Sequence, residues 1–531
     1  MKVQIDSRHG IPESFLARFG ENCTGVLSGF DRLRFRGSLR TLQDVSGMMA
    51  YLYAAKVKLV DFSTHVNALT LQVREHAKAM AEAVGQKVQF LRSHAEHKFE
   101  LAEQELERRG GAPGLVAIYS ALEPCRTFSL HRDAERRRLE LQAEAGKCLH
   151  LYFYFLHELY GLMHLRLQTW FPFTVQVWLN GRRWLARLME QAGLGFVQQQ
   201  NCFTYIEDVA AAQRLSDQQL ETDWPGLLDG MLRQCHPLAG QLCATTRQPY
   251  YWSLSESEYA TDVMFRSPAA LKACYPRFLH HGIAHFGSQD VLRFLGSQSQ
   301  AREVHGKFGG EIYTTWARRP EGVCLKHHAA GNSIKMYNKE GSVLRVESTL
   351  DNPRFFKVLR PLESAPEQPL CWQKLRKGVA DTHRRAELGR AANRRYLEAL
   401  AAVSSDQPAG TVAQTIFRPR TKQGRRARAL NPWSKQDGAL LEAIAAGEWT
   451  INGFRNRDVR AALFGSGKNP AEAKRLAART TRLLALLRIH GLIQKIPKTH
   501  RYQVTAKGRQ IITALQAARR ASIEKLSDLA A

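Results

Sequence analysis

Apolar positions repeat with two different periods along this chain, and the changes of period divide it into parts. In the first 245 residues, the i, i+3, i+4 spacing typical of amphipathic helices alternates with the period-two spacing typical of half-buried strands. Helices are predicted over residues 42–54, 66–84, 93–109, 183–192 and 208–234, and strands over residues 26–36, 115–119, 126–131, 148–155 and 161–179. This mixture predicts an N-terminal α/β region over residues 1–245.

A second, sheet-rich part follows over residues 246–360. One helical segment, residues 268–286, lies between an opening strand at residues 258–266 and a run of further strands. Those strands are predicted at residues 311–318, 322–329, 332–338 and 343–350. The pattern predicts a central α+β sheet unit with one face of the sheet free for a site.

Residues 361–430 lose the apolar repeat and gain positive charge. A helix is predicted over residues 372–403, and residues 404–432 have the composition of a linker, since the RPRTKQGRRARAL run offers no apolar period for a core. Between Trp372 and Pro432 there are 14 Lys plus Arg against four Asp plus Glu, a net charge of +10. We expect a basic linker whose arginines, Arg425 and Arg426 among them, either contact phosphates without reading sequence or serve only as a solubilising tether.

The last part, residues 431–531, shows three apolar repeats of helical spacing and then a hairpin pattern. Gly465-Ser466-Gly467 breaks the chain before the third helix, which begins near Asn469-Pro470 and ends at Gly491. This helix has leucines on one side and Lys and Arg residues on the other. Residues 492–505 then predict a β-hairpin with a basic tip.

The order of helix, helix, basic helix and hairpin, with the HGLIQK…HRYQVTAKGR run, resembles the winged-helix domain of MarR-like and ArsR-like regulators. The resemblance implies a DNA-binding domain whose third helix lies in the major groove. The residues expected at the DNA are Lys474, Arg475, Arg479 and Arg482 on the helix, and Lys498 and Arg501 on the hairpin. A solvated basic face is the alternative.

The charge of the whole chain favours a polyanionic partner. Its 76 Lys plus Arg against 49 Asp plus Glu give a net charge of +27, and clustered cations gain affinity for phosphates by releasing counterions. DNA is therefore the predicted partner, with RNA as an alternative. No apolar stretch of spanning length and no secretory signal is visible, so we expect a cytoplasmic protein that does not use a membrane. The nine cysteines form no CxxC pair, and the oligomeric state stays open.

The hairpin over residues 331–353, GNSIKMYNKEGSVLRVESTLDNP, contains the strongest candidate for catalysis. Strand alternation places Lys335 and Tyr337 on one face of its first strand, and Arg345 and Glu347 on one face of its second strand. The segment resembles the RxYxK…RvE stretch of trans-acting plasmid rolling-circle replication initiators, in which the tyrosine attacks a DNA phosphodiester.

This resemblance implies a metal-dependent strand-nicking endonuclease that acts in replication initiation of a mobile genetic element. It implies Tyr337 as the nucleophile, with Lys335 as a cation that favours its phenolate. Asp262 and Glu347 would be metal ligands, and His327 or its neighbour His328 would complete the set. The expected ion is Mg²⁺ or Mn²⁺, because hard divalent ions prefer oxygen and imidazole ligands.

Two other interpretations remain open. Lys–Tyr and Arg–Glu pairs also stabilise an ordinary sheet, and the chain would then be a non-catalytic binding protein for DNA or RNA. Alternatively, a nuclease or recombinase site lies in the N-terminal region, where Asp31, Glu123 and His164 are candidate metal ligands. Aromatic and cationic residues are interleaved around residues 150–173, which suits either a buried sheet or a surface that stacks single-stranded bases. The predicted architecture is an α+β multidomain chain, with an N-terminal α/β region, a central α+β sheet unit, a basic linker and a C-terminal winged helix.

Overall fold

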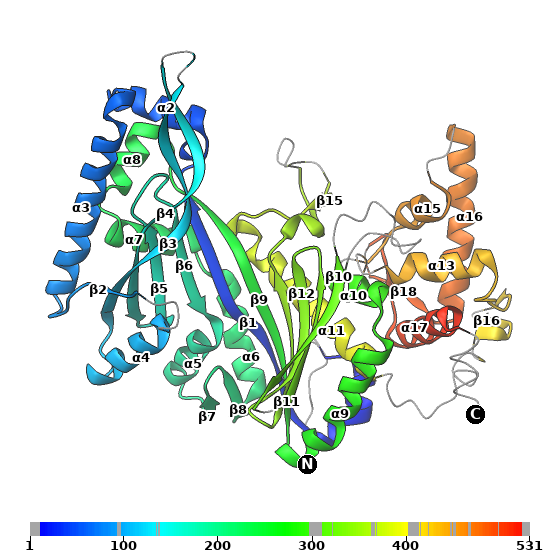
Figure 1. The fold of residues 1–531 in the computed structure, drawn as a ribbon. Helices are drawn as coiled ribbons and strands as arrows, with labels where there is room; N and C mark the ends of the chain where they lie inside the picture. Colours follow the sequence, from blue (N-terminus) through cyan, green and yellow to red (C-terminus); the bar gives the residue numbers. More distant parts are fainter. Residues whose placement is uncertain are drawn as a thin grey trace. The chain divides into compact units, whose positions relative to one another are not determined.

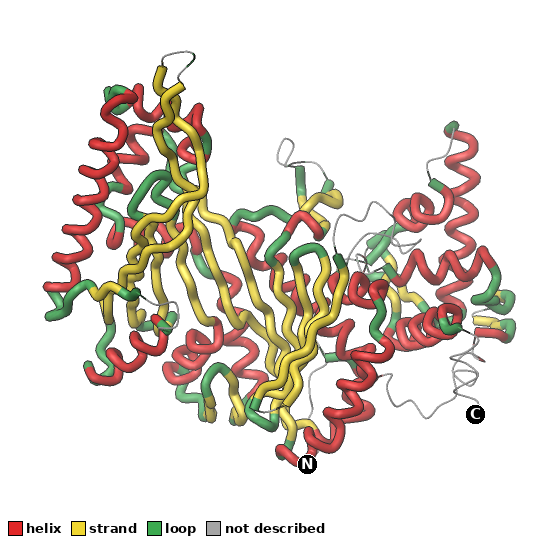
Figure 2. The backbone as a smooth tube through the Cα atoms, in the orientation of Figure 1, coloured by secondary structure: helices red, strands yellow, loops and turns green. Residues whose placement is uncertain are grey.

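Helices and strands are mixed in an α+β architecture around one large mixed sheet in the computed structural model of this chain (Figures 1 and 2). The structure describes residues 11–92, 97–133, 135, 138–296, 311–320, 322–362, 367, 369–401, 414, 416–422, 424–446, 449, 453–465, 469–497 and 499–522. The α+β class predicted from the sequence is therefore confirmed. None of the described helices is long and apolar enough to cross a membrane.

Contacts within the chain divide it into two compact units. The first contains Met1–Ser28, Tyr259–Leu375 and Arg384–Ala531, and the second contains Gly29–Glu258 and Arg376–His383. Both long strands at the divisions, β1 (Cys23–Ser38) and β9 (Tyr251–Phe265), contribute residues to each unit. This division differs from the boundaries expected from the sequence, which placed residues 1–245 together.

The strand order of the sheet is β10-β11-β12-β13-β9-β1-β6-β5-β4-β3-β2. The pairs β3–β4, β4–β5, β10–β11, β11–β12 and β12–β13 are antiparallel, and β2–β3 is parallel. Antiparallel hairpins can leave one face of a sheet exposed, whereas the other face packs on helices.

The second unit supplies the longest strands. Besides its share of β1 and β9, its strands are β2 (Gln89–Phe90), β3 (Gly114–Asp133), β4 (Arg138–His157), β5 (Gly161–Gln168), β6 (Val175–Asn180), β7 (Phe196–Gln199) and β8 (Cys202–Ile206). Its helices are α2 (Val45–Ala54), α3 (Phe62–Glu82), α4 (Lys98–Arg108), α5 (Gly181–Gln191), α6 (Val209–Gln218), α7 (Trp224–Cys235) and α8 (Ala239–Thr246).

The two faces of the sheet in the second unit differ in polarity, because side chains alternate along each strand. Phe35 of β1 pairs with Val177 of β6, which pairs with Leu165 of β5, and all three are fully buried. Their chain neighbours form the opposite face, on which Arg34 is exposed and Trp178 is half-buried. The apolar face supplies the core of this unit, and the other face is polar.

The first unit contains the rest of the large sheet and four helices that share a buried cluster with it. Its elements up to residue 401 are α1 (Glu13–Phe19), α9 (Pro268–His285), α10 (Ser288–Leu295), β10 (Ile312–Arg319), β11 (Gly322–Ala329), β12 (Asn332–Lys339), β13 (Val343–Leu350), β14 (Lys357–Arg360), β15 (Cys371–Lys374) and α11 (Thr382–Ala401). Phe278 of α9 and Tyr396 of α11 share one buried apolar cluster with Met336 of β12 and Val346 of β13. The polar neighbours of these strand residues therefore lie on the other face of the sheet.

The C-terminal part of the first unit has the order of elements expected from the sequence. It contains β16 (Arg420–Lys422), β17 (Arg425–Ala427), α13 (Lys435–Ala445), α15 (Asn456–Phe464), α16 (Pro470–Ile489), β18 (Ile493–Lys495), β19 (Tyr502–Val504) and α17 (Ala506–Arg520). Leu440, Val459, Leu487 and Ile511 come from four different helices and meet in one buried cluster. Three helices, a hairpin and a closing helix thus share a core.

Several predicted segments differ from the structure. The strand predicted over residues 161–179 is two strands, β5 and β6, and the helix predicted over residues 208–234 is two helices, α6 and α7. Residues 115–131 form one continuous strand, in which Pro124 pairs with Lys147 of β4 on one side and lies beyond the short β2 pairing on the other side. The helix predicted from residue 372 begins only at Thr382, after β15. The predicted linker contains the β16–β17 hairpin, and Ile416 and Leu430 beside it are buried in the C-terminal core.

Candidate functional site

The residues predicted to be catalytic meet on the polar face of β12 and β13. Lys335 pairs directly with Glu347, and Tyr337 pairs directly with Arg345. The Tyr337 hydroxyl donates a hydrogen bond to Glu347 Oε2 at 2.9 Å, and Lys335 Nζ lies 2.7 Å from Glu347 Oε1. The hairpin therefore holds a hydroxyl, a carboxylate and an ammonium group in one connected cluster.

The Glu347 carboxylate is fully buried but remains charged. Burial by itself raises the pKa of Glu347, but the charges of Lys335 and Arg345 and the hydrogen bonds from Lys335 and Tyr337 outweigh it and lower the pKa to about 2. Tyr337 is 7% exposed, so its hydroxyl lies mostly within the protein. The Glu347 carboxylate therefore acts as the hydrogen-bond acceptor of the Tyr337 hydroxyl. A substrate phosphate would have little access to this hydroxyl.

The second predicted carboxylate ligand, Asp262 on β9, is bound by an arginine. Arg345 Nε donates to Asp262 Oδ1 at 2.6 Å, and Arg345 Nη2 donates to Oδ2 at 2.9 Å. Both side chains are almost completely buried, with exposed fractions of 1% and 2%. This bidentate ion pair is the arrangement expected when a guanidinium neutralises a buried carboxylate.

His327 does not join the cluster, so its assignment as a metal ligand is wrong for this geometry. In the β11–β12 register Lys326 pairs with Lys335, which turns His327 to the opposite face. There His327 Nδ1 lies 2.9 Å from Thr314 Oγ1, and Nε2 lies 3.2 Å from the Tyr396 hydroxyl. Burial lowers the pKa of His327 to about 4, so the ring is neutral near pH 7.

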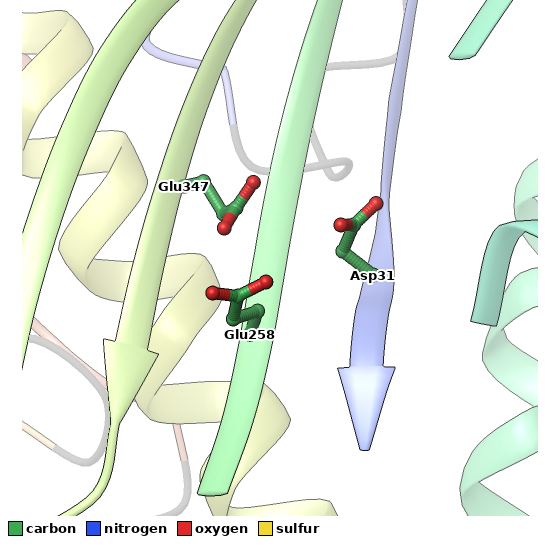
Figure 3. A group of neighbouring side chains, drawn as sticks. All are labelled: Asp31, Glu258 and Glu347. Carbon is green, nitrogen blue, oxygen red and sulfur yellow. The ribbon is translucent and has the colours of Figure 1, made fainter. Parts of the chain in front are cut away.

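One group of acidic side chains among the described residues has the spacing of a metal site. Oxygens of Asp31, Glu258 and Glu347 lie within 4.8 Å of one another, and Figure 3 shows these residues on β1, β9 and β13. Each of the three has a polar partner: Asp31 accepts a hydrogen bond from Asn201 at 2.7 Å, Glu258 accepts one from Arg32 at 2.8 Å, and Glu347 is bound as described above. A cation there would compete with these partners.

The metal site expected from Asp31, Glu123 and His164 is not formed. His164 lies in the same cross-strand row as Trp178 and Arg34, whereas alternation along β1 turns Asp31 to the other face. Glu123 is held by Arg166 at 2.7 Å and by the Tyr152 hydroxyl at 2.5 Å. These contacts support the interpretation of this region as sheet structure.

Helix α16 carries basic residues that are expected from the sequence to lie at DNA. Asn469 caps it by accepting a hydrogen bond from the Glu472 backbone amide at 2.9 Å, and Pro470 occupies its first turn. Leu483, Leu484, Leu486 and Leu487 are buried on its inner side. This packing fixes the direction in which the outer side of the helix points.

The outer side of α16 carries four exposed cations at helical spacing, which we call the basic stripe. It consists of Lys474, Arg475, Arg479 and Arg482. Arg475 is 76% exposed and has Glu472 at 3.7 Å, a surface pair of little strength. The Arg479 guanidinium lies 4.8 Å from the Phe464 ring centre, which positions it over the end of α15. All four residues stand where the sequence placed them.

The hairpin and linker residues behave differently from the basic stripe. Arg501 is 8% exposed and donates from Nη1 to the Gly453 carbonyl at 3.1 Å, so its assignment to an exposed DNA-binding tip is wrong. Arg426 is exposed on β17. Lys498 lies outside the described residues, and for Arg425 the structure describes only the β17 backbone.

Comparisons with protein-family models, with curated proteins and with solved structures give no match for this chain. The candidate sites therefore rest on the geometry alone.

Sequence reasoning missed two features of these sites. The partner of Asp262 was missed because the contact to Arg345 joins strands 83 residues apart in the sequence. The face on which His327 lies could have been predicted from the turn that joins β11 and β12. In this turn Ala330 and Gly331 both have positive φ, and Ala329 pairs with Asn332, which fixes the register of the two strands. Counting back from that turn puts Lys326 and His328, and not His327, on the face of Lys335.

Proposed function

We propose that this protein binds duplex DNA through its C-terminal domain, with α16 in the major groove and the β18–β19 hairpin beside it. The observation that carries the proposal is the basic stripe on a helix whose other side is buried. The major groove of B-DNA admits an α-helix, and each cation that neutralises a phosphate releases counterions. The likeness in element order to MarR-like and ArsR-like regulators also supports it.

The charges around the basic stripe support a polyanionic partner. Glu472 is the one acidic residue of α16, and its contact with Arg475 is weak. Arg426 on β17 adds a cation in the same unit, and the whole chain carries +27. The exposed basic side chains of the stripe are therefore available to bind phosphates.

The test measures how the affinity of the full-length protein for duplex DNA changes with salt. In Arg475→Ala/Arg479→Ala/Arg482→Ala, we expect the dependence of log affinity on log salt to flatten by up to about three units, since each lost phosphate contact is worth roughly 0.9. Fluorescence anisotropy of a labelled duplex at several salt concentrations gives both slopes.

The matched control removes the same charge from the second unit. Arg108 and Arg138 are exposed there and Arg187 is half-buried, and each is paired with one glutamate. Replacing these three by alanine should leave the slope nearly unchanged. Equal loss in both variants would show that net charge alone causes binding, and a clear preference of the parent protein for RNA would favour the RNA alternative.

A strand-nicking activity at Tyr337 is the second candidate, because the Tyr337 hydroxyl and Lys335 both contact Glu347. The burial of Tyr337 favours the binding function over nicking. A catalytic Mg²⁺ or Mn²⁺ would also have to displace Lys335 from Glu347 and Arg345 from Asp262. A covalent adduct with DNA would decide for nicking, and its test is given in the Discussion.

A further inference from the structure

A small cavity in the first unit is lined by three arginines and one glutamate. It has a volume of about 60 Å³, and its charged lining residues are Arg293 of α10, Arg395 and Glu398 of α11, and Arg509 of α17. One water needs roughly 10–15 Å³ of such space, so the cavity has room for a group larger than a water. Ile444, Trp449 and Ile512 provide apolar walls.

Two of the three arginines already have an acidic partner. Arg509 Nε donates to Glu398 at 2.7 Å, and Arg293 Nη2 lies 3.2 Å from Asp290. Arg293 also reaches Thr513 at 3.5 Å. Glu398 and Asp290 are therefore each already paired with an arginine.

Arg395 differs from these two arginines. It is 8% exposed, and its Nε donates to the uncharged carbonyl of Phe294 at 2.8 Å. Its Nη2 atom is buried and has no hydrogen-bond partner among the described residues. Buried charges in proteins are normally paired, so a guanidinium in this state lacks an anion.

The titration of Arg395 agrees with this geometry. Burial lowers the pKa of Arg395 to about 9, Glu398 opposes that shift, and Arg293 and Arg509 add to it by repulsion. Glu398 and Asp290 together do not balance the three guanidinium groups. A bound anion would relieve both the burial and the repulsion.

We propose that this cavity binds a small oxyanion, such as a phosphate group, with Arg395 as the main ligand and Arg293 and Arg509 beside it. A planar guanidinium suits an oxyanion because it presents parallel N–H groups to two oxygens. The lining residues come from α10 and α11 on one side and from α13, β19 and α17 on the other. The anion would thus bridge the C-terminal domain and the helices of the central sheet. The proposal is independent of DNA binding by α16.

The experiment is thermal unfolding of the full-length protein with inorganic phosphate, at an ionic strength held constant with sodium chloride. We expect a saturable rise in Tm of about 2–4 °C at a phosphate concentration 100 times the Kd, because a ligand of the folded state stabilises it by mass action. Isothermal titration calorimetry measures the same Kd directly. Parallel titrations with adenosine monophosphate and with acetate distinguish a free phosphate, a phosphate ester and a carboxylate as the source.

Three variants make the test specific. Arg395→Met should abolish the rise and increase Tm without phosphate, because it removes the unbalanced buried charge. Arg395→Lys keeps the positive charge but lacks the planar guanidinium, so it should raise the Kd for phosphate at least tenfold. If Arg395→Met does not fold, the Kd of Arg395→Lys measured by calorimetry tests whether Arg395 is the ligand. Arg488→Met, at an exposed position on α16, should behave like the parent.

A parent protein that responds to phosphate no more than to chloride overturns the proposal. An equal rise in Arg395→Met also overturns it, because the effect would then be general stabilisation by an excluded salt. The variant that lacks the three arginines of the basic stripe should keep full phosphate binding. Failure of DNA binding and failure of this site are therefore seen in separate measurements.

Discussion

The buried pair of Asp262 and Arg345 gives the sharpest test of whether the polar cluster is structural or catalytic. Both side chains are almost inaccessible, and two hydrogen bonds of 2.6 and 2.9 Å join them. Arg345→Met would leave the Asp262 carboxylate buried without this partner. Removing one member of such a pair costs about 3–5 kcal/mol, since the other charge stays uncompensated.

Replacing both partners should be far less harmful than replacing one. Asp262→Leu combined with Arg345→Met removes both charges, and buried pairs replaced in this way are often neutral or up to about 1–4 kcal/mol more stable. The double-mutant cycle should therefore give a coupling energy of several kcal/mol. Urea unfolding followed by tryptophan fluorescence measures all four proteins. The control is Arg138→Met, in an exposed pair with Glu140, which should change stability by less than about 1 kcal/mol.

Divalent metal separates the two interpretations of Asp262. If Asp262 is a structural partner, Mg²⁺ or Mn²⁺ should leave the stability of Arg345→Met unchanged. If Asp262 is a metal ligand, the freed carboxylate should bind the ion and recover stability as its concentration rises. Single variants that each lose less than about 0.5 kcal/mol would refute the reasoning, because a surface substitution typically changes stability by that little.

Three further predictions concern single side chains. Tyr337→Phe should leave DNA binding unchanged. The parent protein and this variant are each incubated with DNA and Mg²⁺. A denaturant-resistant protein–DNA adduct that forms with the parent protein only would establish nicking. The pKa of Glu347 lies below its ordinary 4.5 in the folded protein, so its stabilising contribution is complete above about pH 4.5 and is lost as the pH falls toward 2. Glu347→Gln should therefore be less stable at pH 7 and show a flatter acid-side loss of stability in unfolding measured across this range. Asn469→Ala removes the cap of α16 and should cost about 1 kcal/mol in urea unfolding.

The features that the sequence predicted correctly depend on neighbours along the chain. The hairpin of Lys335, Tyr337, Arg345 and Glu347 follows from alternation across one short turn, and the structure has the same facing. The order of elements in the C-terminal domain follows from local breaks such as Gly491. Periodicity and turn residues carry such information within a few residues of each element.

The features that the sequence did not predict depend on contacts between distant segments. The sequence predicts that Arg501 is exposed, because it lies in a basic hairpin. In the structure Arg501 is buried and donates a hydrogen bond to the Gly453 carbonyl, 48 residues earlier in the chain. Arg395 lies on a helix rich in arginines, and only the packing of α10, α13 and α17 around it makes its charge unusual. No local pattern distinguishes these two arginines from the exposed ones of the basic stripe.

The division of the chain also has a consequence for its synthesis. Phe15 and Phe19 of α1 pack on Phe278 of α9, so an early segment of the first unit depends on one made much later. At roughly 5–20 residues per second, about 260 residues and some 13–53 s separate the two on a ribosome. Meanwhile nearly all of the second unit emerges, since it is continuous from Gly29 to Glu258. The aromatic side chains of α1 thus stay uncovered on the nascent chain for that interval, and a chaperone that binds exposed apolar segments would find them there.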